Sequence, residues 1–153
     1  MKTIGVLLLL LFSVSSSLRA GDIRGSIFGV GMVFGDPTGI TVKSWLDNYT
    51  AIDAAASWDT EKDSVTAQLG LLIHDFEPFY GGDATLLIYY GVGTRFKSES
   101  GKESRVGVRG VAGLAWLFER SPFELFIEIG PLMNVVPKTE PDITGGIGIR
   151  FYL

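Results

Sequence analysis

Apolar and polar residues alternate along most of the chain after Gly21, with the period of two that is typical of β-strands whose two faces meet different surroundings. Short stretches rich in Gly, Pro, Asp, Asn and Ser separate the alternating runs and favour turns. The pattern predicts an all-β chain of eight strands. They are expected over residues 23–34, 39–46, 51–58, 64–74, 84–96, 104–118, 122–133 and 143–153.

An even number of strands joined in sequence favours an antiparallel up-and-down β-barrel, in which successive connections lie at alternate ends. A barrel of eight strands has a lumen only wide enough to be filled by side chains. We therefore expect a closed lumen and not a pore. The connections expected at one end are 35–39, 58–64, 97–103 and 134–142, and those at the other end are 47–48, 75–83 and 119–121.

The two faces of the expected strands differ in chemistry. One face is uniformly apolar, as Phe28, Leu69, Ile127 and Ile149 illustrate, and the other mixes glycine and aromatic residues with ionisable ones. A soluble barrel filled with these charges would lack an apolar core and would expose large apolar patches to water. In a bilayer, lipid solvates the apolar side chains and closure satisfies the backbone. The pattern therefore predicts a transmembrane barrel with its apolar faces outward.

Opposite charges on the second face are expected to pair inside the barrel. If the chain turns around Asn48, Lys43 faces Asp53 directly across the ladder, at a separation where charges interact. The polar interior is either a ligand or proton path or a satisfied polar core, and the balance of acids and bases favours the polar core. The same reasoning places Arg109 near Glu128 and Arg150 near Glu124 or Glu128, which gives one lumen network of Lys43, Asp53, Arg109, Glu124, Glu128 and Arg150.

Arg95 and Arg105 are expected to face each other beside the 97–103 connection, where like charges repel. They form a candidate site for an anion such as an anionic lipid head group. The alternative is that the two side chains are hydrated at the rim or reach separate carboxylates.

His74 is the only histidine and precedes Asp75, so the residue inventory allows a Ser/His/Asp arrangement. However, the chain has no Gly-x-Ser-x-Gly motif, and the strand count puts His74 at the end away from the outer leaflet. We therefore expect a structural histidine, no catalytic residues and no enzymatic activity.

Composition excludes several classes of site. The chain has no cysteine and one histidine, so disulfides, thiolate zinc sites and His-rich metal sites are ruled out. Thirteen basic residues against 17 acidic ones leave no basic excess for binding nucleic acid. No cofactor is expected.

Residues 1–20 differ from the rest of the chain. Lys2 precedes an apolar run over 4–14, and small and polar residues then lead to Ala20. This layout predicts a secretory signal peptide cleaved after Ala20. A membrane anchor is the alternative, but the run is shorter than the ~20 residues that a spanning helix needs. The exported domain is then 21–153.

Several segments of the chain share one resemblance. They are GDPTGITVKSWL (35–46), AID (51–53), YGVG (90–93), VR (108–109) through GL (113–114), and GGIGIRFY (145–152). These segments resemble a family of small, largely uncharacterised outer-membrane β-barrel proteins of Gram-negative and other diderm bacteria. The resemblance implies an eight-stranded barrel in the outer membrane with Lys43 and Asp53 at lumen-facing positions, and it brings no established activity.

The last residues resemble the signal that the outer-membrane assembly machinery reads, with apolar side chains at Ile149, Phe151 and Leu153. Leu153 departs from this signal, because an aromatic residue is usual at the last position. The expected partners are this machinery and outer-membrane lipid.

Together these features predict a non-enzymatic, integral outer-membrane protein with a structural or surface-interaction role and with both termini facing the periplasm. Two alternatives stay open. One is a lipid-modifying enzyme on the same scaffold, which requires a catalytic cluster at the outer rim. The other is a soluble periplasmic barrel that holds an apolar ligand, which requires the apolar face to point inward.

Overall fold

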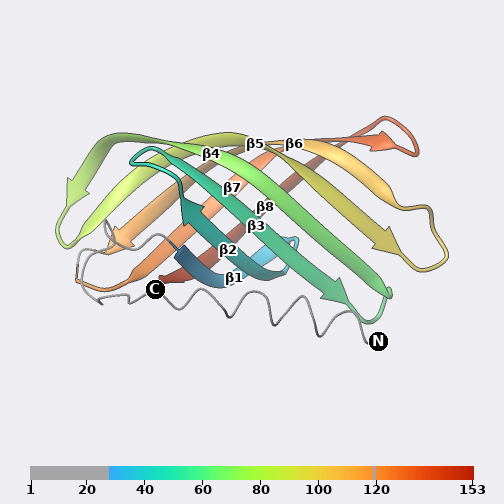
Figure 1. Ribbon diagram of the computed structural model, residues 1–153, viewed down its shortest axis with the longest axis horizontal. Coiled ribbons are helices and arrows are strands. Elements are labelled where there is room, and N and C mark those ends of the chain that lie inside the picture. Colours follow the sequence, from blue (N-terminus) through green and yellow to red (C-terminus); the bar gives the residue numbers. More distant parts are fainter. Residues whose placement is uncertain (1–27, 119) are drawn as a thin grey trace.

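The computed structural model describes residues 28–118 and 120–153, and for residues 76–81 it describes the backbone alone. The predicted signal peptide and the first residues of the first expected strand lie outside these ranges. The strands follow one another obliquely across the molecule (Figure 1). They are β1 (Phe28–Asp36), β2 (Gly39–Trp45), β3 (Thr50–Asp59), β4 (Ser64–Gly81), β5 (Ala84–Glu99), β6 (Arg105–Phe118), β7 (Phe123–Val136) and β8 (Glu140–Tyr152).

Each strand pairs antiparallel with the next, and β1 pairs with β8, so the sheet closes into a barrel of eight strands. This confirms the predicted up-and-down architecture. The connections β1–β2, β3–β4, β5–β6 and β7–β8 lie at one end, which we call the four-connection end. The other three connections lie at the opposite end, the three-connection end, together with the C-terminus (Figure 1).

Within the described part of the chain, no helix is long and apolar enough to cross a membrane.

Strand β4 is longer than the expected strand over 64–74. Residues 75–83 were expected to form a connection, but β4 continues to Gly81 after an irregularity in the pairing between Asp75 and Phe79. The turn needs only two residues, because Gly82 adopts a φ of 68°, which glycine reaches without strain. The β4–β5 hairpin consequently reaches farthest at the three-connection end (Figure 1).

The outer wall of the barrel is apolar, as the alternation predicts. Leu69 is 55% exposed, Ile127 46% and Ile149 40%, whereas Lys43 on the other face is 1% exposed. A soluble barrel around an apolar ligand requires the opposite orientation, so the structure does not have the arrangement of that alternative.

The lumen is filled by side chains of both kinds. Its buried polar residues share the space with a small apolar cluster that includes Leu72, Leu87, Val111 and Phe126. The ring of Tyr89 on β5 lies over its cross-strand partner Gly113 on β6, where a β-carbon would overlap the ring. The interior is therefore packed around aromatic and charged side chains.

Candidate functional site

Lys43 lies at the centre of a buried polar cluster near the three-connection end. The alternation of β2 turns its side chain into the lumen, where its Nζ donates to Glu124 Oε2 at 3.0 Å. The same nitrogen lies 2.9 Å from His74 Nε2 and 4.5 Å from the centre of the Trp45 ring. An ammonium group is only a donor, so Nε2 of His74 accepts and Nδ1, 3.3 Å from the carbonyl oxygen of Tyr49, carries the proton.

Glu124 is the shared acceptor of this cluster. Besides Lys43, it accepts hydrogen bonds from Arg150 Nη1 at 2.7 Å and from the Tyr152 hydroxyl at 2.7 Å. Arg150 sits opposite Glu124 in the β7–β8 ladder and donates to Thr41 Oγ1 at 3.0 Å. The carboxylate is completely buried, and these donors replace the water it would otherwise bind.

A second cluster lies closer to the four-connection end. Arg109 donates to Glu128 Oε1 at 3.0 Å and to Gln68 Oε1 at 2.7 Å. The Tyr89 hydroxyl donates to the other oxygen of Glu128 at 2.9 Å. Arg109 and Glu128 thus come together as expected from the sequence, although Tyr89 and Gln68 were not expected to join them.

The predicted direct pair of Lys43 with Asp53 is wrong, although the register is right. The two residues are cross-strand partners in β2 and β3, yet Lys43 pairs with Glu124 and Asp53 lies 3.7 Å from Arg150. The long side chains reach across the narrow lumen instead of along the wall. Reasoning from neighbouring strands therefore finds the Arg109–Glu128 and Arg150–Glu124 pairs but misses the partners that Lys43 and Asp53 take.

Several members of the lumen clusters were missed by sequence reasoning. The missed residues are uncharged hydrogen-bonding side chains that lie on the same face as the charges. The alternation was a sufficient signal to place them in the lumen, but not to name their partners. They are Thr41, Gln68, His74, Tyr89 and Tyr152.

The predicted pairing of Arg95 with Arg105 is also wrong. Arg105 faces Lys97 across the β5–β6 ladder, while Arg95 faces Gly107. Arg95 is buried and donates from both terminal nitrogens to the carboxylate of Asp36, with Nη1 3.0 Å from Oδ2. The structure therefore separates the two arginines, because the register of the β5–β6 ladder differs by two residues from the expected one and Asp36 on β1 engages Arg95.

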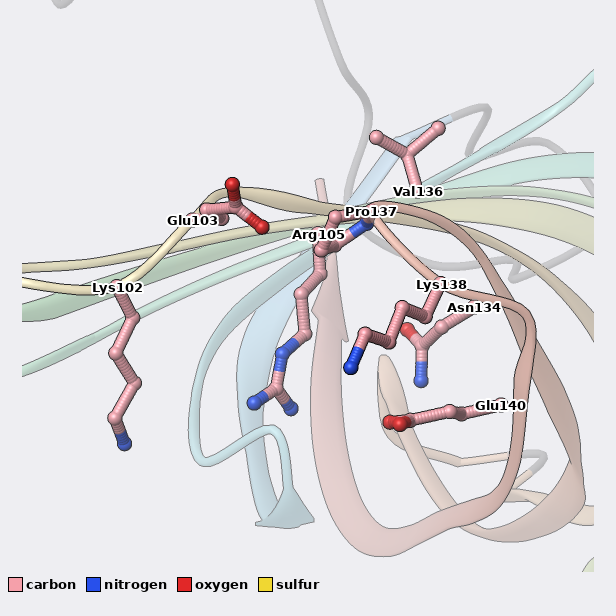
Figure 2. Close-up of a pocket in the computed structure, with 8 residues that line it drawn as sticks. All are labelled: Lys102, Glu103, Arg105, Asn134, Val136, Pro137, Lys138 and Glu140. Carbon is pink, nitrogen blue, oxygen red and sulfur yellow. The ribbon is translucent and has the colours of Figure 1, made fainter.

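Arg105 instead lines a hollow at the four-connection end, which we call the rim pocket. It has a volume of about 280 Å³ and lies between the β5–β6 connection and the β7–β8 hairpin. Figure 2 shows Arg105, Asn134, Lys138 and Glu140 turned toward the same space. The lining residues are Lys102, Glu103, Arg105, Asn134, Val136, Pro137, Lys138 and Glu140.

The side chains of the two lumen clusters and of the rim pocket are suited to binding and packing. Among the described residues, no group of three or more His, Cys, Asp or Glu side chains could hold a metal ion. Both ring nitrogens of His74 are engaged, one by Lys43 and the other by the Tyr49 carbonyl. The absence of enzymatic activity remains a prediction.

The residues of the expected assembly signal lie on the outer wall. Ile149, Phe151 and Leu153 are exposed, while Arg150 and Tyr152 between them point into the lumen. Their recognition by an assembly machinery stays a prediction.

No protein-family model matches the chain, and neither the curated proteins nor the solved structures compared with it give a match.

Proposed function

We propose that the chain is an integral outer-membrane β-barrel protein without an open pore, with a structural role or a role in interactions at the cell surface. The observation that carries the proposal is the inverted distribution of polarity. Large apolar side chains such as Val92, which is 63% exposed, cover the wall, while Lys43, Glu124 and Arg150 are buried within it. In water such a wall favours aggregation, whereas hydrocarbon solvates it.

Closure of the sheet supports the same proposal. A barrel leaves no unpaired strand edge, so its backbone groups are satisfied without water, as a membrane interior requires. An even number of strands brings the start of β1 and the end of β8 to one end of the barrel. With that end in the periplasm, the four-connection end and its rim pocket face the outside of the cell.

The proposal is tested by adding one charge to the wall. In a bilayer, Ile127→Arg places a guanidinium against lipid and lowers the free energy of unfolding by about 2–4 kcal/mol. Ser100→Arg, in the exposed β5–β6 connection, is the matched control and should cost little. Urea unfolding of the protein in phosphatidylcholine vesicles measures both values.

If this barrel instead stood in water with its apolar wall exposed, Ile127 would face water, and arginine would be tolerated or favoured there. Vesicle flotation and electrophoresis with and without boiling complete the test. We expect the folded protein to float with the vesicles and to migrate differently until boiled. A protein that stays in buffer without detergent and gains solubility from Ile127→Arg would overturn the proposal.

A further inference from the structure

Three cations lie near one another on one side of the four-connection end, although acidic residues outnumber basic ones over that end as a whole. Lys97 and Arg105 face each other directly across the β5–β6 ladder, an arrangement that is unfavourable for like charges. Lys138 adds a third cation from the β7–β8 connection, and Figure 2 shows its ammonium group and the Arg105 guanidinium turned toward one hollow.

Glu99, Glu103 and Glu140 lie beside the same connections, and none of these described residues forms an ion pair within 4.0 Å with those three cations. Glu99 pairs with Lys102 at 2.6 Å. Glu103 lines the hollow, but Figure 2 shows its carboxylate turned away from the charged groups of Arg105 and Lys138. Glu140 is the acid that faces the hollow. In the part of the chain that the structure describes, the ion pairs within 4.0 Å do not include Lys97, Arg105 or Lys138.

Neutral hydrogen-bonding capacity completes the rim pocket. Asn134 is 9% exposed, and its register places it opposite Gly107 on β6 and Glu140 on β8. Its amide can donate to an anion, and the Glu140 carboxylate can accept from a hydroxyl or ammonium group beside that anion. The site therefore suits a ligand that carries an anionic group next to a hydrogen-bond donor.

The rim pocket also lies where the apolar wall ends. Val106, Met133 and Val135 are exposed on the outer face of the strands that form the pocket. The charged residues of the pocket follow within a few positions along the same strands. In a bilayer this level is that of the lipid head groups, directly beyond the hydrocarbon.

We propose that the rim pocket binds the phosphate group of a membrane lipid, with Arg105 and Lys138 as its cationic contacts. The planar guanidinium donates to two phosphate oxygens and the ammonium adds a point charge. A volume of about 280 Å³ accommodates a head group, while the acyl chains stay against the apolar wall. This inference rests on the proposed function, because only a barrel in a bilayer brings the pocket to head-group depth.

The test compares lipids with and without phosphate on the full chain folded in detergent micelles. Native mass spectrometry follows the binding of dioleoyl phosphatidic acid, of dioleoylglycerol, which lacks the phosphate, and of glycerol 3-phosphate, which lacks the acyl chains. We expect one tightly bound phosphatidic acid, no comparable binding of dioleoylglycerol, and glycerol 3-phosphate binding at least about tenfold weaker. Equal binding of glycerol 3-phosphate would overturn the lipid assignment in favour of a soluble phosphate ester.

Variants assign the binding to the pocket. Arg105→Gln and Lys138→Gln are each expected to weaken phosphatidic acid binding about tenfold, since each removes a charge-assisted contact. Lys62→Gln, an exposed cation in the β3–β4 connection, is the charge-matched control and should bind as the wild type does. Glu140→Gln removes a negative charge and should bind at least as well as the wild type.

The outcomes separate the two proposals. Unchanged binding in Arg105→Gln and Lys138→Gln, or an equal loss in Lys62→Gln or Glu140→Gln, overturns the phosphate site. Electrophoresis without boiling checks that each variant is folded. Arg105 and Lys138 are replaced one at a time, so the test does not depend on a variant in which both are changed. Flotation with phosphatidylcholine vesicles tests membrane insertion independently, so its failure would overturn the proposed function and not merely the site.

Discussion

Glu124 is the residue on which the buried charges of the lumen depend most directly. It accepts from Lys43, Arg150 and Tyr152 within 3.0 Å and is completely buried. Glu124→Gln leaves the two cations without their shared counter-charge, and removal of one partner of a buried pair costs about 3–5 kcal/mol. Urea unfolding in micelles, followed by tryptophan fluorescence, should show a loss of this size.

Glu103→Gln is the control for that experiment, because Glu103 is exposed in the β5–β6 connection. Surface charges contribute about 0–1 kcal/mol, so this variant should unfold close to the wild type. If Glu124→Gln were as stable as Glu103→Gln, the lumen charges would not be held by the network described above.

Gly113 tests how tightly the lumen is filled. A methyl group at this position would overlap the ring of Tyr89, so Gly113→Ala forces the ring or the wall to move. Overpacking of this kind costs about 1–3 kcal/mol. Gly110→Ala is the matched control, since the nearest atoms, in Pro131, are 3.4 Å away.

The same unfolding assay compares the two glycine variants. We expect Gly113→Ala to be clearly the less stable. Gly113→Ala should cost less stability in a Tyr89→Leu background than in the wild type, because the ring atoms nearest to the new methyl group are then absent. The Tyr89→Leu single variant accounts for the lost hydrogen bond to Glu128. An equal cost of Gly113→Ala in both backgrounds would place the strain elsewhere in the barrel.

At the level of the strands, alternation was enough to predict which face of each strand is buried. Leu69 and Ile127 point outward and Lys43 points inward. A one-residue shift in register would reverse every face, so the alternation specifies which face is buried. The end of β4 was not predictable in this way, since residues 75–83 combine turn-forming glycine and proline with a pairing irregularity. Local propensity favoured a loop where continued pairing with β5 extends the strand.

The pairs between neighbouring strands, Arg109 with Glu128 and Arg150 with Glu124, were predictable, whereas the partners of Lys43 and Asp53 were not. Lys43 on β2 meets Glu124 on β7, and Asp53 on β3 approaches Arg150 on β8. These strands are not neighbours in the sheet. Cross-ladder reasoning covers adjacent strands, whereas the length of a lysine or arginine side chain lets it span a narrow lumen.

The β2–β3 turn gives a pH-dependent prediction at the level of one element. Hydrogen bonds from the backbone N–H groups of Tyr49 and Thr50, each 2.7 Å long, hold the pKa of Asp47 below its ordinary value of 3.8. Because the folded pKa is lowered, the stabilisation is complete above about pH 4 and is lost as the pH falls through the folded pKa. Asp47→Ala should therefore differ from the wild type most at neutral pH.

Unfolding curves of both proteins between about pH 6 and pH 2 measure this difference. Asp47→Asn keeps a side-chain acceptor for the turn and should lose less stability than Asp47→Ala. The stability of Asp47→Asn should also vary less with pH in this range, because the carboxyl group that titrates in the wild type is absent. A gap between the wild type and Asp47→Ala that is constant with pH would contradict the assigned hydrogen bonds.

At the scale of the whole molecule, the closure of eight strands sets the width of the lumen, and the side chains fill that width. Eight strands leave a lumen about as wide as its side chains, and the charges inside are held by one another instead of by bulk water. Arg150, Tyr89, Lys43 and Phe126 are among the largest completely buried side chains. The interior of the molecule thus combines a polar network with a small apolar cluster.

This filling predicts that the folded barrel conducts no ions. Lys43 and Arg150 meet Glu124 across the lumen, and Arg109 meets Glu128 at a second level, so an ion entering from either end encounters two bonded layers. Breaking either layer would leave buried charges unpaired, which opposes spontaneous opening. Planar bilayers containing the wild-type protein should therefore show no discrete current steps in potassium chloride. Reproducible steps from folded, boiling-sensitive protein would mean that the side chains of both layers move aside together and that the lumen serves as a path.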